Sequence, residues 1–228
     1  MRDKSAGLLY EYELIFELES MPMMTEAEAM DVLPAKQARS RATRDALVRA
    51  GRNLCEIKDF DELSVAEIAA EAGCSVGSFY SRFSDKDGFF RAIVGDAERW
   101  ETAHTPIASH DPKQAIDELL ADVIASTLAG YRRRRGLIRA AIRRSMTEPA
   151  LWEPYRKRGQ DHSDRLVARL KRAFPRDRGL ERRVRFACQM LYGTLNNAVL
   201  IAPGPLQLDD ADLESELLRA FRRIILEP

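Results

Sequence analysis

The sequence predicts an all-α protein with an N-terminal helix-turn-helix domain and a larger helical C-terminal domain. Residues 64–83 have the pattern of two short helices joined by a tight turn, and later stretches repeat apolar residues at the helical period. We expect an extension at 1–35 that fits neither domain, a helix-turn-helix domain at 36–84 and a helical domain at 85–228. A linking helix at 85–104 is expected to join the two domains.

Local residue choices mark the ends of the two short helices. Ser64 can cap the first helix, and Glu67 three residues later completes a capping box. Gly73 falls where a left-handed residue would end that helix, because glycine adopts a positive φ without steric strain. Ser75 can cap the second helix. These signals predict a tight turn between the two helices.

The second helix opens with small side chains, which is unusual for a core element. Small residues let a helix N-terminus, with its partial positive charge, approach a phosphate or a base edge closely. Tyr80 lies on another face with its hydroxyl free to donate. This arrangement is typical of a recognition helix in the major groove of DNA. We assign base-edge contact to Val76, Gly77 and Ser78, with Ser75 at the start of the same surface.

Three segments resemble the DNA-binding domain of the TetR family of bacterial transcription regulators. They are SVAEIAAEAG at 64–73, SVGSFYSRF at 75–83 and SDKD at 84–87. Residues 37–94 follow the family's pattern without a gap, with one departure at Cys74, where the family usually has an aliphatic residue. The resemblance implies a dimeric, sequence-specific DNA-binding regulator. It further implies a repressor that a small ligand releases from a palindromic operator.

The resemblance also implies which side chains hold the DNA backbone. In the family a lysine and a tyrosine clamp a phosphate, and the matching residues are Lys86 and Tyr80; we add Ser64 as a third phosphate contact. For Lys86 a plain surface position is the alternative. The first helix, expected at 36–58, carries basic residues in its leading turns that suit phosphate or minor-groove contact, or an ordinary solvated face: Arg39, Arg41 and Arg44.

Composition favours a cytoplasmic protein. The 228 residues carry a formal net charge of zero, but residues 1–35 are acidic, so the basic excess lies in the rest of the chain. The three cysteines are widely spaced without a C-x-x-C pair, which fits a reducing cytosol and argues against a disulfide framework or a zinc site. No apolar run reaches the roughly 20 residues that span a bilayer, and the acidic N-terminus does not fit a secretory signal.

The N-terminal extension leaves two interpretations open. Residues 10–19 alternate like a strand, yet the apolar side chains also fit one helical face, and the many Glu and Leu residues favour a helix. One interpretation is an appended arm that docks on its own dimer or blocks DNA. The other is a start codon assigned too early, with Met21, Met23 or Met24 as the true start.

Proline, glycine and aspartate residues divide the C-terminal domain into helices. Asp111 can cap the first of them, with Pro112 at its first position, and Asp209 or Asp210 can cap the last. The arginine run at 132–135 suggests either a second nucleic-acid surface or a solvated helix end, and the lack of interleaved aromatic residues favours the solvated end. The other arginines of this group are Arg139, Arg143 and Arg144. The helices expected in this domain are 112–134, 136–147, 149–174, 178–201 and a last helix up to about residue 225.

The last two helices are apolar on more than one face, which predicts a partner. The resemblance implies that they form a four-helix interface in a homodimer, where Gly193 permits a close approach. The alternative is that these residues belong to the core of one chain. We assign the interface to Leu191, Leu195, Ala198, Leu217 and Phe221.

A ligand cavity in the C-terminal domain is plausible. A ligand bound there can prefer the dimer conformation with one spacing of the two DNA-binding domains, and it then raises the population of that conformation. Core packing is the alternative for each candidate lining residue. A cavity lined by these candidates is apolar with few charged anchors, which predicts an uncharged or amphipathic effector. The candidates are Trp100, Leu128, Tyr131, Met146, Trp152, Tyr155, Phe186 and Met190.

The sequence holds no recognisable catalytic constellation. His104, His110 and His162 lie on different segments without a cysteine or carboxylate at a metal-ligand spacing, and no G-x-S-x-G, P-loop or G-x-G-x-x-G motif occurs. We therefore expect no enzyme activity, cofactor or metal. Two alternatives stay open: a DNA-binding regulator or architectural protein without ligand control, and an enzyme with an unfamiliar site on a helical scaffold.

Overall fold

The computed structural model describes the backbone of residues 26–101 and 115–227, and the side chains of residues 38–95 and 115–227. All regular elements in these ranges are helices, so the prediction of an all-α fold is confirmed. The chain forms two compact units, residues 1–43 and 44–228. The boundaries predicted at residues 35 and 84 stay a prediction.

The described part of the first unit is the beginning of helix α2 (Glu26–Ile57), which continues into the second unit. Within the first unit the Thr43 hydroxyl donates a hydrogen bond to the Arg39 carbonyl oxygen at 3.0 Å. The helix begins ten residues before the predicted start at residue 36, so residues 26–35 of the extension are helical. Residues 1–25 lie outside the described residues, and both interpretations of the extension stay open.

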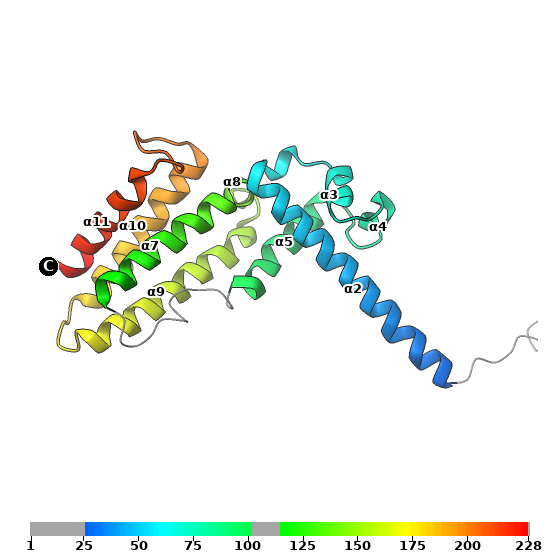
Figure 1. Cartoon of the computed structure of the whole chain (residues 1–228), viewed down its shortest axis with the longest axis horizontal. Coiled ribbons are helices and arrows are strands. Elements are labelled where there is room, and N and C mark those ends of the chain that lie inside the picture. Colours follow the sequence, from blue (N-terminus) through cyan, green and yellow to red (C-terminus); the bar gives the residue numbers. More distant parts are fainter. Residues whose placement is uncertain (1–25, 102–114, 228) are drawn as a thin grey trace, which may run out of the picture. The chain divides into compact units, whose positions relative to one another are not determined.

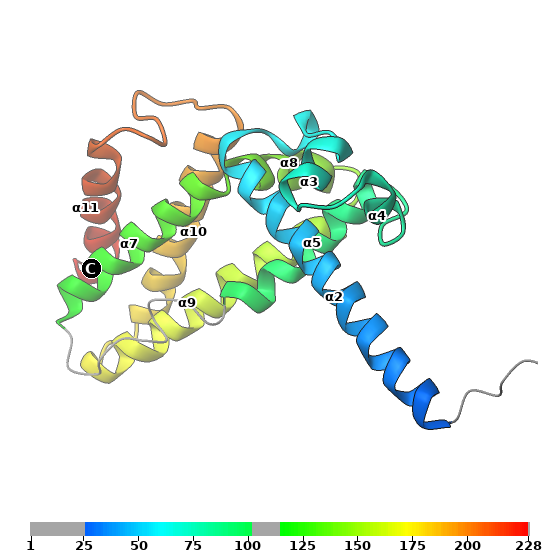
Figure 2. The same cartoon turned by 45° about the vertical axis from the view of Figure 1, so that its right-hand side comes forward.

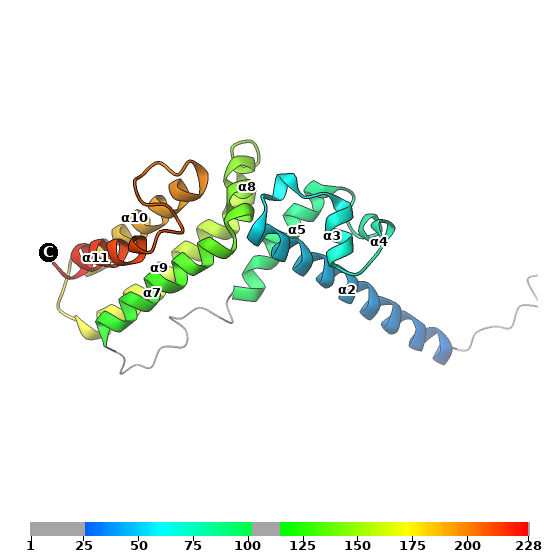
Figure 3. The same ribbon diagram turned by 45° about the horizontal axis from the view of Figure 1, so that its top comes forward.

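In the second unit, four elements follow α2 in close succession: the 3₁₀ helix η1 (Phe60–Glu62), α3 (Val65–Glu71), α4 (Val76–Tyr80) and α5 (Lys86–Glu101). Figures 1 and 3 show α3 and α4 as neighbouring short helices. A cluster of phenylalanine rings forms their core. The Phe79 and Phe89 ring centroids lie 5.1 Å apart, and those of Phe60 and Phe90 lie 4.7 Å apart. These edge and tilted contacts fix α4 against α5.

The C-terminal helices form a bundle around a second core. They are α7 (Ile116–Arg133), α8 (Arg135–Ser145), the 3₁₀ helix η2 (Pro149–Trp152), α9 (Glu153–Ala173), α10 (Leu180–Leu200) and α11 (Asp212–Leu226). Helix α10 packs against α9 and α11, and α7 packs against α11 (Figures 1 and 2). The core is largely aliphatic, and its fully buried side chains include Leu128 of α7, Leu166 of α9, Leu195 of α10 and Ile225 of α11.

Helix α8 joins the two groups of helices within the second unit. Gly136 lies against the end of α2, where an added Cβ atom would come within 2.4 Å of the Lys58 carbonyl oxygen. The Arg139 guanidinium donates to the Asp59 carboxylate at 2.8 Å and to the Val199 carbonyl oxygen at 2.8 Å. The bundle and the helix-turn-helix region are therefore in direct contact through α8.

Arg144, near the end of α8, makes a second connection. Its guanidinium donates to the Asp61 carboxylate at 2.7 Å and also pairs with the Asp87 carboxylate. The same group lies 5.4 Å from the Phe60 ring centroid and 4.9 Å from that of Phe90. The prediction that the arginines of this run form a solvated helix end is therefore wrong for Arg144, because ionic and cation–π partners lie across the fold.

Several predicted helix ends need correction. At the start of α5 the Asp85 carboxylate accepts a hydrogen bond from the Gly88 amide at 2.6 Å, whereas the sequence pattern alone had favoured Ser84 as the cap of this helix. Ala211, and neither predicted aspartate, precedes α11. At the end of α2, the apolar Ile57 is 85% exposed, whereas Cys55 is buried. The predicted cap at Asp111 lies outside the described residues.

Candidate functional site

The turn between α3 and α4 has the geometry that the sequence predicted. The Ser64 hydroxyl accepts from the Glu67 amide at 3.1 Å, and the Glu67 carboxylate accepts from the Ser64 amide at 2.7 Å, which completes the capping box. Gly73 has a φ of +67°, the left-handed conformation that ends α3. The Ser75 hydroxyl accepts from the Ser78 amide at 3.1 Å and caps α4.

Helix α4 presents a small, uncharged surface. Val76 is 41% exposed, Gly77 is exposed, and Ser78 is half-buried with its hydroxyl 3.0 Å from that of Ser75. Tyr80 is 55% exposed, with its ring edge-on to Phe79. The five residues of this helix include no acidic side chain. Such a surface can approach an anionic DNA backbone without like-charge repulsion.

Two predicted phosphate contacts are engaged within the chain. The Lys86 ammonium donates to the Asp61 carbonyl oxygen at 2.9 Å and lies 5.1 Å from the Phe60 ring centroid. Burial lowers the pKa of Lys86. The Ser64 hydroxyl donates to the Glu67 carboxylate at 2.7 Å. Phosphate contact by either side chain therefore stays a prediction, and it requires exchange of these bonds.

The three basic residues predicted on the first helix lie on α2. Arg39 and Arg41, in the first unit, are exposed. Arg44, in the second unit, is half-buried and lies 3.5 Å from the Asp45 carboxylate. Their contact with DNA stays a prediction.

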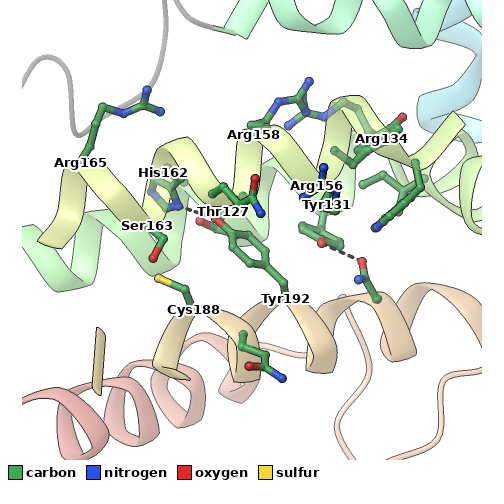
Figure 4. A pocket seen from close by; sticks show the side chains of 18 of the residues that line it. Thr127, Tyr131, Arg134, Arg156, Arg158, His162, Ser163, Arg165, Cys188 and Tyr192 are labelled. Atoms are coloured by element: carbon green, nitrogen blue, oxygen red, sulfur yellow. Dashed lines mark hydrogen bonds between the residues drawn. The ribbon is translucent and has the colours of Figure 1, made fainter. Parts of the chain in front are cut away.

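The C-terminal bundle contains a cavity of about 780 Å³, lined by α7, α8, α9 and α10. Figure 4 shows this cavity with its labelled lining residues. Its volume is in the range of about 300–1,000 Å³ that small-molecule sites occupy. Of the predicted lining residues, Tyr131, Trp152 and Tyr155 do line it.

The other predicted lining residues are found elsewhere. Leu128 is fully buried in the core, whereas Met146, Phe186 and Met190 are exposed at the surface and do not line the cavity. The side chain of Trp100 lies outside the described residues. These differences arise because helical spacing alone does not distinguish an inward face from a second apolar face.

The charge of the lining also differs from the prediction. We expected few charged anchors, but the lining contains six arginines and, among the described residues, no aspartate or glutamate. Two of them pair with carboxylates outside the lining, Arg156 with Glu153 and Arg185 with Asp164. The lining also contains Arg133, Arg165, Arg134, whose Nε atom donates to the Gly130 carbonyl oxygen, and Arg158, which lies 5.5 Å from the Tyr155 ring centroid.

Hydrogen-bonded side chains cross the cavity. The His162 imidazole bonds the Tyr192 hydroxyl, and the Tyr131 hydroxyl donates to the Asn196 side-chain oxygen at 2.8 Å (Figure 4). Burial, together with the nearby positive charge of Arg165, lowers the pKa of His162 to about 4, so the imidazole is neutral at physiological pH. One feature of the sequence indicates such a site, the polar middle of α9, because a polar stretch inside a bundle helix requires polar neighbours.

The predicted dimer residues are mostly internal. Leu191, Leu195 and Phe221 are at most 3% exposed within one chain and pack in its core, and their contact with a partner stays a prediction. Ala198 and Leu217 are half-buried. The exposed apolar face of α10 instead carries Phe186 and Met190 and, just after the helix ends, Ile201, at 52%, 48% and 65% exposure.

Comparison with known proteins identifies this fold. Residues 47–93 match a family profile described as bacterial regulatory proteins, tetR family. A TetR regulator from Rhodococcus sp. RHA1 is 19% identical, with a TM-score of 0.51 over 84% of this chain and 99% of its own. A tetR-family regulator from Streptomyces coelicolor is 20% identical, with a TM-score of 0.56 over 79% and 81%. No curated protein sequence matches the chain.

A third solved structure, a putative tetR-family regulator from Mesorhizobium loti, is 20% identical, with a TM-score of 0.55 over 82% of this chain and 98% of its own. The fold is thus that of helix-turn-helix transcription regulators. The matched domain is that of the tetR family of bacterial regulatory proteins, so the resemblance found in the sequence is confirmed. Among the described residues, no helix is long and apolar enough to cross a membrane, and no group of side chains is suited to hold a metal ion.

Proposed function

We propose that the protein is a homodimeric, sequence-specific DNA-binding regulator of the cytoplasm, which represses transcription until a small ligand fills the bundle cavity. The observation that carries the proposal is the tetR-type helix-turn-helix, with its capped turn and the uncharged, exposed surface of α4. On this proposal Val76, Gly77 and Ser78 meet base edges, and Tyr80 holds a phosphate.

The exposed face of α10 supports pairing of two chains. Phe186, Met190, Gly193 and Ile201 recur at spacings of four, three and eight residues, which keeps them on one face of the helix and its C-terminal end. An added Cβ atom at Gly193 would meet no atom of the described residues within 4 Å, so no described part of the chain covers this position. Two copies crossing at Gly193 would cover the same apolar residues on both chains, as a two-fold interface requires.

Contacts across the second unit support ligand control. Helix α9, one wall of the cavity, packs against α5, which directly follows the recognition turn. The Arg91 guanidinium on α5 also forms two hydrogen bonds, each 2.9 Å, with the Glu148 carboxylate just before η2 and α9. A ligand that favours one position of α9 therefore biases the position of α5, by as much as its affinities for the two states differ.

Fluorescence anisotropy with the whole chain and labelled DNA from upstream of its own gene tests the DNA-binding part. We expect saturable binding that exceeds binding to scrambled DNA and weakens with salt. Tyr80→Ala should weaken binding to all sequences, whereas Ser78→Ala should change which sequence is preferred. Equal losses on every sequence for both variants would contradict this division of roles.

Sedimentation velocity tests the dimer. The double variant Phe186→Glu, Met190→Glu should sediment as a monomer, because it places charges in the proposed interface. Met146→Glu is the matched control, since Met146 is 83% exposed on a different surface. A double variant that remains dimeric would place the interface elsewhere.

A further inference from the structure

Three tyrosines line the described part of the cavity, and their hydroxyl groups differ in what they bond. The Tyr131 hydroxyl donates to the Asn196 side-chain oxygen at 2.8 Å, and the Tyr192 hydroxyl bonds the His162 imidazole (Figure 4). The Tyr155 hydroxyl is buried and has no hydrogen-bond partner in the part of the chain that the structure describes. Because a buried polar group without a partner costs free energy, this hydroxyl favours an occupant that can bond it.

The Tyr155 hydroxyl is a hydrogen-bond donor at neutral pH. Burial raises the pKa of Tyr155 to about 12, although the nearby positive charges of Arg158 and Arg134 act in the opposite sense, so the phenol keeps its proton. A guanidinium group carries only donors, so neither arginine can accept that proton. The partner that the Tyr155 hydroxyl requires is therefore a hydrogen-bond acceptor.

Two packing contacts hold the Tyr155 ring in the cavity wall. The ring stacks on that of Trp152, with a centroid distance of 4.9 Å and an interplanar angle of 15°. The guanidinium carbon of Arg158 lies 5.5 Å from the Tyr155 ring centroid. A ring held in this way keeps its hydroxyl in place before a ligand arrives, which lowers the entropic cost of binding.

The other side chains of the lining favour a flat apolar body. Tyr131, Trp152 and Tyr192 present aromatic rings, and Ile138 of α8 adds an aliphatic side chain. Aromatic ligands pack well against such walls, in offset or edge-on arrangements. The volume of about 780 Å³ is large enough for a drug-sized molecule.

We propose that the cavity binds a neutral aromatic compound whose carbonyl oxygen accepts a hydrogen bond from the Tyr155 hydroxyl. This inference rests on the proposed function in treating the occupant as the effector, and it narrows the uncharged or amphipathic effector expected from the sequence. A single donor requires a single acceptor oxygen, and a carbonyl group supplies it without the cost of burying a charge in the bundle.

Tyr155 also lies where the two cores of the second unit meet. Both Trp152 and Tyr155 pack against the aliphatic core of the bundle and against the phenylalanine core of the helix-turn-helix region. A ligand bonded to Tyr155 therefore contacts a side chain that touches the helix-turn-helix core. Such a ligand can favour one arrangement of that core over another.

Equilibrium dialysis of the whole chain with 2-acetylnaphthalene and 2-isopropenylnaphthalene tests the proposal without DNA. The second probe has a similar shape but carries a CH₂ group in place of the carbonyl oxygen. Tyr155→Phe removes the hydroxyl and keeps the ring, so it should weaken 2-acetylnaphthalene about three- to tenfold and change 2-isopropenylnaphthalene by less than about twofold. Tyr131→Phe is the matched control, because it removes a hydroxyl that already has a partner, and it should affect both probes equally.

Thermal unfolding without a ligand tests whether the hydroxyl is unpaired. Tyr155→Phe should be at least as stable as the unaltered chain, because it removes a buried donor without a partner. Tyr131→Phe should be less stable, because it breaks the bond to Asn196. A Tyr155→Phe chain that melts at a lower temperature would show that the hydroxyl is bonded within the chain, and would overturn the proposal.

Three binding results would also overturn the proposal. They are binding of neither probe by the unaltered chain, an equal effect of Tyr155→Phe on both probes, and tighter binding of the anion 2-naphthoate than of 2-acetylnaphthalene. Anisotropy with operator DNA separates this proposal from ligand release. Binding of 2-acetylnaphthalene through Tyr155 that leaves the DNA bound contradicts ligand release alone, whereas release of DNA by both probes to the same extent, with or without the Tyr155 hydroxyl, contradicts the hydrogen bond alone.

Discussion

The contact between Gly136 and the end of α2 allows a quantitative test of how the bundle meets the helix-turn-helix region. In Gly136→Ala the added Cβ atom would lie 2.4 Å from the Lys58 carbonyl oxygen and 2.9 Å from that of Cys55. Both neighbours are backbone atoms, so α8 and α2 must separate by about 1 Å to restore ordinary contact. Side-chain rearrangement cannot relieve the overlap.

The expected magnitude follows from two opposing effects. Overpacking of this kind destabilises by about 1–3 kcal/mol, whereas alanine in place of glycine stabilises a helix interior by up to about 1 kcal/mol. Gly95→Ala in α5 is the matched control, because an added Cβ there meets no atom within 4 Å in the part of the chain that the structure describes. Because the gain from replacing glycine by alanine applies to both variants, we expect Gly136→Ala to be about 1–3 kcal/mol less stable than Gly95→Ala.

Thermal unfolding followed by circular dichroism measures this difference. For a chain of this size it corresponds to a melting temperature about 2–12 °C lower for Gly136→Ala than for Gly95→Ala. Urea unfolding at a fixed protein concentration gives the free energies directly. A Gly136→Ala variant as stable as Gly95→Ala would refute the close approach of α8 to α2.

Three further predictions concern the turn and its contacts. Gly73→Ala should lower the free energy of unfolding by about 1–2 kcal/mol, measured by urea unfolding, because its φ of +67° is strained for any residue with a Cβ. The hydrogen bond from Lys58 holds the pKa of Glu67 at about 2, below its ordinary 4.5. The stability that the ionised Glu67 carboxylate gives is therefore present above pH 4.5 and is lost as the pH falls toward 2. Glu67→Gln should flatten the dependence of the free energy of unfolding on pH in this window. Arg144→Met should lower the free energy of unfolding by about 1–2 kcal/mol, and about 1 M salt should reduce the difference, because ion pairs and a cation–π contact are lost.

Local signals made the helix-turn-helix predictable. The Ser64 capping box, the left-handed Gly73 and the Ser75 cap each depend on residues within three or four positions, and all three are present in the structure. Such features do not depend on the rest of the fold. The all-α class was predictable for the same reason, since helical periodicity is local.

The faces of α10 were not predictable in the same way. Leu191 and Leu195, predicted at a dimer interface, lie in the core, whereas Phe186 and Met190, predicted to line a cavity, are exposed. A helix that is apolar on two faces carries two overlapping periodic patterns. Only the packing of α10 against α9 and α11 shows which face is internal.

The arginines were the least predictable feature. Arg144 bonds Asp61 across 83 positions of sequence, and Arg139 bonds Asp59 across 80. A run of positive charge in the sequence does not reveal partners so distant along the chain. The arginine-rich lining of the cavity was unpredictable for the same reason, because Arg134 and Arg158 come from different parts of the bundle.

Selection of bound DNA from a random pool by the whole chain tests the central claim most directly, because the operator sequence need not be assumed. A dimer with two recognition helices should enrich an inverted repeat whose half-sites lie about one helical turn apart or a multiple of it. Tyr80→Ala should enrich nothing under the same conditions. A pool that remains random with the unaltered chain would contradict sequence-specific binding, and a single unrepeated motif would contradict binding by a dimer.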